Sequence, residues 1–380
     1  MRKLILALIL LPALARAQEK PAEAEAPAKR IEAETSRSYL RFAFNFYKQK
    51  DGEGNPNLKE DMTVLEPQIL LGLGLGEKLS LNLKLQADII TAASVDKKYR
   101  FLPGTQSGAS GDKFFGAEGG LFYAWSDQVK TGIGVSTSTE YDYKSRGINA
   151  RFIYDTPDKN DTFLIKASAF FDTLDIIKFD GSEDGTESRN SYSLGLGWTH
   201  VLGRRTQMTL NYDLTIQRGF LATPYNSVFI RGKEYEEVLP SSRMRHNLFG
   251  RVRHLLLDDL AVEPGIGVYA DDWGALAFNL EVRAFWEAIP GVLIVQPWYR
   301  FHGQTEVDQF VDTSASSLPK HRTQDSDLDA FDSHTFGLKL VTPHVKIFGI
   351  DTEFELGADY SIRSDFLDSY SVTFGVMVRF

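Results

Sequence analysis

The chain ends with Tyr370-Ser371-Val372-Thr373-Phe374-Gly375-Val376-Met377-Val378-Arg379-Phe380, and this stretch decides the fold. Its even-numbered residues are large and apolar or aromatic, and its odd-numbered residues, except Met377, are small or polar. Successive side chains of a β-strand point to opposite faces, so this segment predicts a strand with one apolar and one polar face. In a transmembrane β-barrel, lipid covers such an apolar face and the last strand closes the barrel against the first.

The same alternation begins near residue 37 and continues to the end of the chain. Leu40, Phe42, Phe44 and Phe46 share one face of the first segment, and Arg41 and Asn45 lie on the other. No soluble sandwich would keep one face this charged and the other this apolar for so long. We therefore predict an all-β fold, a transmembrane antiparallel β-barrel of about sixteen strands, an even number as is typical of bacterial barrels. The expected strands are 37–49, 61–75, 79–93, 115–126, 129–143, 146–156, 161–174, 188–202, 205–217, 242–256, 260–271, 274–288, 292–306, 333–342, 348–362 and 367–380.

The connections between these strands alternate in length. Periplasmic turns of bacterial barrels are short and external loops are longer, so the alternation places both termini in the periplasm. Three connections in the long series, near Lys144, Asp272 and Arg363, are short and leave the strand count open by two. The short connections are 76–78, 126–128, 203–204, 257–259 and 289–291, and the long ones are 51–61, 94–114, 174–187, 219–241 and 306–332.

The N-terminal segment has the pattern of a secretory signal peptide. A basic start at Arg2 and Lys3 precedes an apolar run from Leu4 to Leu14, and Ala15 and Ala17 supply the small residues of a cleavage site. A retained anchor is the weaker alternative, because the run is about half of the ~20 residues that a spanning helix needs. We expect a signal peptide over 1–17, a periplasmic tether over 18–36 and the barrel over 37–380.

Composition excludes several classes of protein. The 380 residues contain no Cys, which excludes a disulfide scaffold and thiolate metal sites. The net charge of −9 gives no electrostatic footprint for nucleic acid. The mean hydropathy of −0.23 and the lack of a second long apolar run exclude a helical membrane protein.

Ten residues of the predicted inner face form the charged stripe, which is the candidate site. An Arg that faced lipid near the bilayer midplane would cost ~2–4 kcal/mol, so the four arginines of segment 242–256 must line the lumen. One interpretation is a wall of neutralising ion pairs. The other is an anion-attracting row beside an acidic one that constricts and selects solutes. The charged stripe comprises Arg243, Arg245, Arg251, Arg253, Glu263, Asp271, Glu281, Arg283, Arg300 and His302.

Two histidines depart from the pattern. His246 and His254 have the parity of the lipid-facing row, which predicts either a position near the membrane interface or a β-bulge that shifts the register.

No other motif carries chemistry. Gly72, Gly74 and Gly76 are not followed by a helix, so they do not indicate a nucleotide site. The acidic segment from Asp325 to Asp332 has Ala330 where a calcium loop needs glycine, which favours a solvated loop. The seven His residues show no metal-ligand spacing. We expect no cofactor and no enzyme activity, although parity alone leaves a hydrolase site in the wall open.

Four short motifs of the chain form a recognisable set: Leu85 to Ser94, Arg218-Gly219-Phe220 with Thr223 to Val228, Glu237 to His246, and Asp271-Asp272-Trp273-Gly274. With these motifs the chain resembles a bacterial domain-of-unknown-function family of uncharacterised outer-membrane barrels. The resemblance implies an outer-membrane barrel and brings no substrate or catalytic residue. It also implies genomic neighbours of a periplasmic redox or maturation system, namely a small lipoprotein, a thioredoxin-like protein and a flavin transferase.

These observations predict a porin-like channel for small polar or charged solutes in the outer membrane of a Gram-negative bacterium. The alternative is a non-transporting barrel that anchors or exports a periplasmic partner, a lipoprotein or a flavoprotein of a redox system. The expected partners are outer-membrane lipid, that periplasmic protein, and the barrel-assembly machinery. The last would recognise an assembly signal made of Phe374, Val376, Val378 and Phe380.

Overall fold

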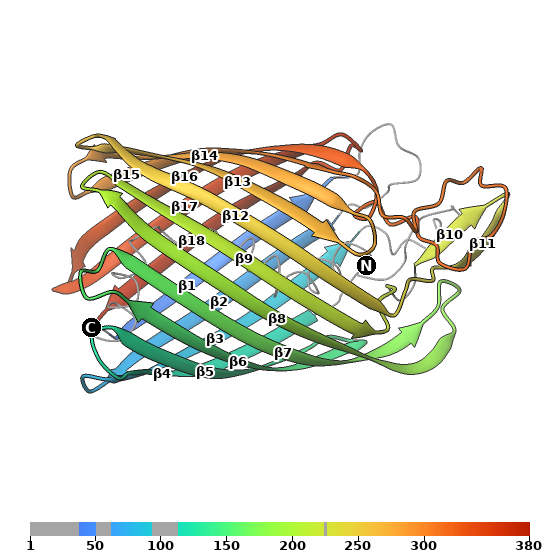
Figure 1. Ribbon diagram of the computed structural model, residues 1–380, viewed down its shortest axis with the longest axis horizontal. Helices are drawn as coiled ribbons and strands as arrows, with labels where there is room; N and C mark the ends of the chain where they lie inside the picture. Colours follow the sequence, from blue (N-terminus) through green and yellow to red (C-terminus); the bar gives the residue numbers. More distant parts are fainter. Residues whose placement is uncertain (1–37, 51–61, 93–112, 224–225) are drawn as a thin grey trace.

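The computed structural model describes residues 38–50, 62–92, 113–223 and 226–380. The predicted signal peptide and tether lie outside these residues. Sixteen strands of the described segments form one closed barrel in which every pair of neighbours is antiparallel (Figure 1). The barrel strands are β1 Tyr39–Gln49, β2 Met62–Leu75, β3 Leu79–Ala92, β4 Lys113–Ala124, β5 Val129–Thr139, β6 Tyr143–Asp155, β7 Asp161–Ile177, β8 Glu183–Gly203, β9 Thr206–Gly219, β12 Ser242–Leu257, β13 Leu260–Asp271, β14 Leu276–Ile289, β15 Leu293–Gln304, β16 Phe331–Ile347, β17 Ile350–Arg363 and β18 Ser369–Arg379.

The terminal stretch closes the barrel as its alternation predicts. β18 pairs with β1 from Tyr39 opposite Arg379 to Gln49 opposite Ser369. The apolar rows of the two strands coincide, because Phe44 lies opposite Phe374. Beyond the ladder, the backbone N–H of Phe380 donates to the carbonyl oxygen of Ser38 at 2.9 Å. Closure removes both sheet edges, which lipid could not have satisfied.

The outer face of the barrel exposes large apolar side chains. On β14, Leu276, Phe278 and Leu280 keep between 44% and 58% of their surface accessible, and the alternate residues Asn279 and Glu281 lie on the inner face. A water-soluble protein would bury such a belt, whereas a transmembrane barrel presents it to lipid. The predicted fold class is thus confirmed, and the periplasmic position of the termini stays a prediction. No helix in the described part of the chain is long and apolar enough to cross a membrane.

The two ends of the barrel differ. We call the end that carries the turns β2–β3, β4–β5 and β8–β9 the short-turn end, and the opposite one the loop end. β18 ends at the short-turn end, on the left of Figure 1. At this end β16 and β17 meet in a turn whose exposed Phe348 has a positive φ of 52°, which is rare for a residue with a side chain.

Two predicted connections at the loop end were wrong in detail. The predicted long loop 174–187 is mostly strand, because β7 and β8 continue beyond the rim as a hairpin (Figure 1). Leu174 and Ile176 pack with Tyr143 there, which gives the hairpin an apolar contact outside the bilayer. The turn expected near Lys144 lies at 140–142 instead, and β6 already begins at the buried Tyr143.

His246 and His254 do not cause a bulge. β12 pairs with β9 in unbroken register from Ser242 to His254. His246 Nδ1 lies 2.8 Å from the hydroxyl of Tyr212, and His254 Nδ1 lies 2.8 Å from that of Thr206. Neighbouring hydroxyl groups therefore satisfy both rings on the outer face.

Candidate functional site: the charged stripe and the cap

The charged stripe runs over the inner face of β12 to β15. Its residues alternate with exposed outer residues such as Leu248 on β12, Val268 on β13 and Val282 on β14. Register pairing brings members of neighbouring strands side by side, with Arg245 opposite Asp271 and Glu281 opposite Arg300. The sheet thus collects ten residues from four strands on one wall.

Arg243 and Asp271 form a buried ion pair at the loop end of the charged stripe. Both Nε and Nη2 of Arg243 donate to Asp271 Oδ2, and the Nε contact is 2.8 Å. The guanidinium also lies over the Trp273 ring, 4.4 Å from its centroid. Asp271 further accepts from the Tyr269 hydroxyl at 2.7 Å and from backbone N–H groups of the β13–β14 turn. This pair therefore holds the rim together.

Three more arginines of the charged stripe are compensated by carboxylates. Glu263 lies between two of them, with Arg253 Nε at 2.9 Å and Arg251 Nη1 at 3.6 Å. Arg283 Nε donates to Glu281 Oε1 at 2.6 Å. These residues therefore form ion pairs, as the first of the two interpretations of the charged stripe predicts.

Arg245 and Arg300 form no ion pair with any carboxylate of residues 38–50, 62–92, 113–223 and 226–380. Arg245 Nη2 donates to the Gln217 side-chain oxygen at 2.5 Å, and its buried Nε has no hydrogen-bond partner. The guanidinium of Arg300 makes no ion pair or hydrogen bond with any residue that the structure describes, and its nearest aromatic contact is Trp298 at 5.8 Å. The last member of the stripe, His302, contacts Asn279 at 2.8 Å and Gln304 at 3.1 Å.

Charged pairs that were not predicted also occur on other parts of the inner wall. Arg41 on β1 donates to Glu355 on β17 at 2.7 Å, and Lys339 lies 3.3 Å from the same carboxylate oxygen. On the opposite side, buried Arg189 on β8 lies 3.1 Å from Asp172 on β7. The alternation predicts that each of these residues faces the lumen. It does not predict the pairs, because the two partners lie on different strands.

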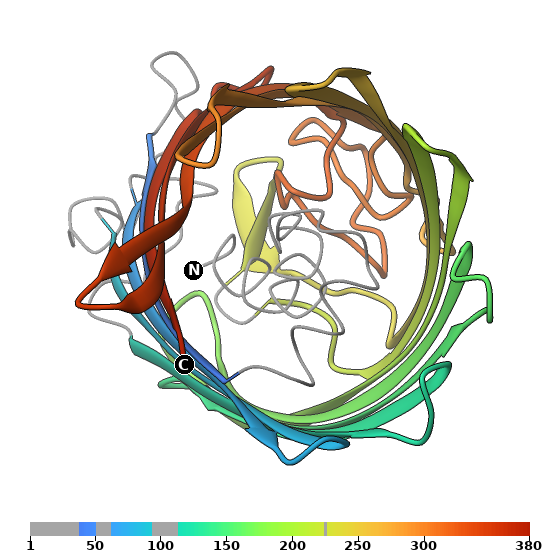
Figure 2. The same ribbon diagram turned by 90° about the vertical axis from the view of Figure 1, so that its left-hand side faces the viewer.

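Two long connections at the loop end fold together into a unit that we call the cap. It consists of the described residues of 220–241, which include β10 Ser227–Ile230 and β11 Lys233–Glu236, and of residues 305–330. The hairpin β10–β11 was predicted as loop; its turn has positive φ at Arg231 and Gly232, as a type I′ turn requires. The cap lies beyond the strand ends in Figure 1 and across part of the opening in Figure 2.

The cap has apolar contacts of its own. Val228 and Ile230 of β10 pack with Val311 of the second connection, which joins the two segments. Val307 and Leu328 pack with Trp273 of the β13–β14 turn, which joins the cap to the barrel. The same Trp273 stacks on Arg243, so the cap rests on the rim beside the charged stripe.

A buried carboxylate organises the centre of the cap. Glu237 accepts from the backbone N–H of Thr223 at 2.9 Å, from Asn226 Nδ2 at 3.2 Å and from the Thr323 hydroxyl at 2.6 Å. Next to it, Val238 and Arg322 exchange two backbone hydrogen bonds of 3.1 and 2.7 Å. The Thr323 contact and the pair of Val238 and Arg322 cross between the two connections, so the shape of the cap depends on both segments.

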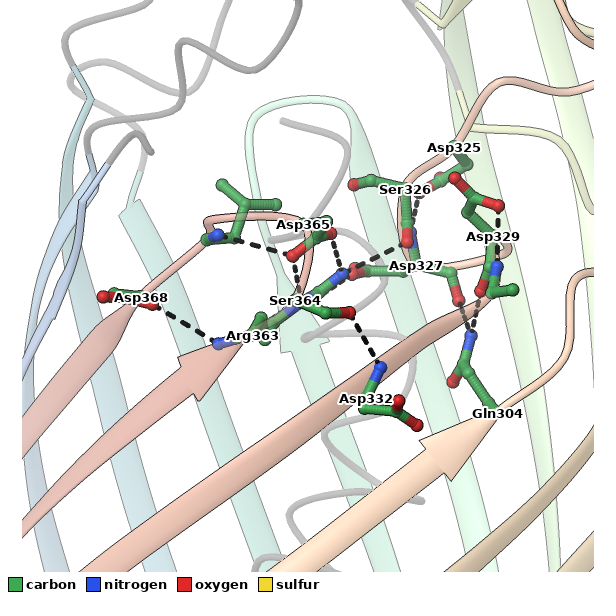
Figure 3. Close-up of polar contacts among 12 residues, drawn as sticks. Gln304, Asp325, Ser326, Asp327, Asp329, Asp332, Arg363, Ser364, Asp365 and Asp368 are labelled. Atoms are coloured by element: carbon green, nitrogen blue, oxygen red, sulfur yellow. Dashed lines mark hydrogen bonds and ion pairs between the residues drawn. The ribbon is translucent and has the colours of Figure 1, made fainter. Parts of the chain in front are cut away.

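Arg363, at the end of β17, links the cap to the β17–β18 turn (Figure 3). Its guanidinium donates to Asp327 Oδ1 at 2.7 Å, to Asp365 Oδ2 at 2.6 Å and to the Ser326 carbonyl oxygen at 3.2 Å. It also stacks on Phe331 at 3.7 Å. We call this cluster the latch.

The expectation of a solvated acidic loop was wrong. Asp325 is 1% exposed and accepts from the backbone N–H of Asp327 at 2.9 Å, and Asp327 belongs to the latch. Backbone groups of the segment are held as well, because Gln304 Nε2 donates to the carbonyl oxygen of Asp329 at 2.7 Å (Figure 3). Among the described residues, no group of three or more His, Asp or Glu could hold a metal ion.

Comparison with known families then places the chain. Residues 112–364, more than half of the chain, match a family described as "Protein of unknown function (DUF3570)". The chain belongs to this family. The predicted resemblance to a domain-of-unknown-function family of barrels is thereby confirmed. No curated protein matches the chain.

Several solved structures are similar to this member of the DUF3570 family. OccK1 (OpdK) of Pseudomonas aeruginosa is 8% identical with a TM-score of 0.42, over 90% of this chain and 98% of that chain. OccD3 (OpdP) of the same organism is 12% identical with a TM-score of 0.44, over 91% and 92%. CdiB from Acinetobacter baumannii is 9% identical with a TM-score of 0.49, over 90% and 60%. At these values no function is transferred to the chain.

Proposed function

We propose that the protein is an outer-membrane channel for small polar or charged solutes. The observation that carries the proposal is the inner wall, where charged side chains line a closed barrel whose outside is apolar. Arg251 and Arg253 keep 23% and 21% of their side-chain surface accessible even though both are ion-paired. A sixteen-stranded barrel has an interior wide enough for an aqueous path.

The cap would set the size of the entrance at the loop end. It rests on the rim through Trp273 and the latch, and its buried contacts give it a defined shape rather than that of a loose loop. Solutes would then pass beside the cap and along the charged stripe, whose charged side chains would favour solutes of one sign of charge over the other.

Conductance of the purified protein in a planar bilayer tests this proposal. We expect stable current steps in KCl, which disappear when the same preparation is unfolded by heat before addition. A folded protein that gives no current would contradict the channel. That result would favour the alternative, a barrel that anchors or exports a periplasmic lipoprotein or flavoprotein.

Location and orientation can be tested separately, because the chain has no Cys. We propose that the loop end faces the exterior and that the termini lie in the periplasm. A single cysteine from Ser317→Cys in the cap should react with a membrane-impermeant maleimide on intact cells. One from Glu77→Cys, in the β2–β3 turn, should react only after the outer membrane is opened. The reverse pattern would overturn the orientation.

A further inference from the structure

We propose that Arg300 and Arg245 are two binding stations for a small oxyanion, a carboxylate or a phosphate, in the lumen. The inference rests on the proposed channel, because it names the class of solute that the wall would take. It follows from a difference within the charged stripe: four of its six arginines are bound to carboxylates, and these two are not bound to any carboxylate in the part of the chain that the structure describes.

The surroundings of Arg300 leave its guanidinium available. Its register partner Glu281 turns along its own strand to Arg283, at 2.6 Å. The nearby Asp359 accepts from the Ser371 hydroxyl at 2.7 Å. On the other side, Arg300 pairs in register with Thr335, whose hydroxyl lies 3.1 Å from that of Ser361. Arg300 thus has two carboxylates nearby, neither of which is hydrogen-bonded or ion-paired to it among the described residues, and two hydroxyl groups that can rotate to donate to an oxyanion.

Trp298 forms the apolar side of this station. The centroid of its ring lies 5.6 Å from the guanidinium of Arg283 and 5.8 Å from that of Arg300. The indole fills the space above Gly337, where a Cβ would overlap it. Hydrogen bonds from a charged donor are stronger beside an apolar surface that excludes water.

Arg245 forms the second station, closer to the cap. Its register partner Asp271 is already taken by Arg243, Tyr269 and two backbone N–H groups. Arg245 therefore contributes a positive charge beside Arg243, two residues away on the same face, and keeps only the neutral Gln217 as an acceptor. A guanidinium held in this way is stabilised by an anion, which could accept two parallel hydrogen bonds from it.

The two stations lie at different positions on the wall. Arg245 pairs in register with Asp271 at the rim, and Arg300 lies on the register row of Glu281, Gly265 and Arg251. Along β12 these two rows are six residues apart, a strand length of roughly 20 Å. The stations are therefore separate sites within the charged stripe.

Anion binding to the purified barrel in detergent tests the stations without any current measurement. Inorganic phosphate and acetate are titrated separately by calorimetry, at constant ionic strength with chloride as background. We expect saturable binding to the wild type that weakens about tenfold or more in both Arg300→Gln and Arg245→Gln, as loss of a charge-assisted contact predicts. The class of oxyanion is then identified by which of the two, phosphate or acetate, shows saturable binding.

Arg253→Gln is the matched control. It removes the same charge from the same wall, but Glu263 keeps Arg251 as a partner, so binding should change less than about twofold. Equal weakening in all three variants would overturn the stations in favour of a diffuse field, and so would the absence of saturable binding to the wild type. Retained β-sheet circular dichroism shows that each variant is folded.

Reversal potentials of the same proteins separate this inference from the channel itself. In a KCl gradient, Arg300→Gln and Arg245→Gln should each shift the selectivity further toward cations than Arg253→Gln does. Current with identical shifts in all three would overturn the stations and leave the channel intact. Saturable binding without any current would overturn the channel and leave the anion sites intact.

Discussion

At the scale of single residues, the charged stripe contains two kinds of arginine. Arg243, Arg251, Arg253 and Arg283 neutralise carboxylates and stiffen the wall, whereas Arg245 and Arg300 do not. The sequence pattern could not separate them, since all six lie at positions that the alternation predicts to face the lumen. The difference comes from which donors already occupy each neighbouring carboxylate. Whether the stripe selects solutes stays a prediction.

Replacing Arg243 should be the most destabilising change in the charged stripe. Arg243→Gln would leave the fully buried Asp271 without its cation, and breaking a buried pair costs about 3–5 kcal/mol. We expect the lower end, because Tyr269 and two backbone N–H groups still donate to Asp271. Urea unfolding in detergent measures the loss. Arg253→Gln should cost much less, and equal costs would contradict the assigned role of the rim pair.

At the scale of elements, the cap is a folded unit made of two connections that are distant in sequence. Its shape depends on contacts across those connections, such as Thr323 to Glu237, and on the latch at Arg363. A loop that is held at both its centre and its edge has fewer open states than a free loop. The cap should therefore open as a unit rather than fray.

Weakening the latch should loosen the cap without unfolding the barrel. Arg363→Gln removes the charged contacts to Asp327 and Asp365 and the stacking on Phe331. We expect amide hydrogen exchange in 305–330 to accelerate about tenfold or more, and exchange in the barrel strands to stay as in the wild type. Arg231→Gln, which removes one exposed contact to the Ala315 carbonyl, is the control. Unchanged exchange in Arg363→Gln would exclude the latch.

Asp329 should make the cap more stable at acidic pH. Burial raises the pKa of its carboxyl, Glu306 and Asp365 raise it further, and the N–H of Ala330 and Arg363 oppose the shift. An aspartate with a raised pKa in the folded cap costs stability as pH rises from its unfolded value of about 3.9 through the folded pKa. That cost is fully present above this window and is relieved as pH falls.

The variant Asp329→Asn removes this titration and retains an acceptor for the N–H of Ala330. At neutral pH, hydrogen exchange of 305–330 should be slower in Asp329→Asn than in the wild type, and the difference should vanish below about pH 4. A difference that is constant across pH would mean that the carboxyl does not titrate in the folded cap.

At the scale of the whole molecule, closure of the barrel joins the first and last strands. β1 and β18 pair over their full lengths, and Phe380 adds a final hydrogen bond to Ser38. The predicted assembly signal at Phe374, Val376, Val378 and Phe380 lies in, and one residue beyond, the strand that completes the ring. An open edge in lipid would leave a full row of unsatisfied backbone groups, so closure and membrane insertion depend on each other.

Deletion of Phe380 should reduce assembly into the outer membrane. The deletion removes an exposed aromatic ring at the short-turn end together with its backbone hydrogen bond. We expect a several-fold lower yield of folded barrel in outer-membrane fractions, read as the heat-modifiable band on a gel. Phe366→Ser, which removes an exposed aromatic ring in the β17–β18 turn, serves as the control. Normal yields after the deletion would contradict the assembly signal.

The sequence by itself determined the barrel and the segregation of apolar and polar faces, and it indicated about sixteen strands, with the count open by two. These features depend on a local two-residue period, which any strand in lipid must obey. Only the tertiary structure decided the rest: that segment 174–187 is mostly strand, that the described residues of 220–241 join 305–330 in the cap, and which arginines have no carboxylate partner among the described residues. The physical reason is that burial outside the bilayer and the pairing of charges depend on contacts between segments distant in sequence, such as Glu237 with Thr323. The alternation of side chains along the sequence gives no information about these long-range contacts.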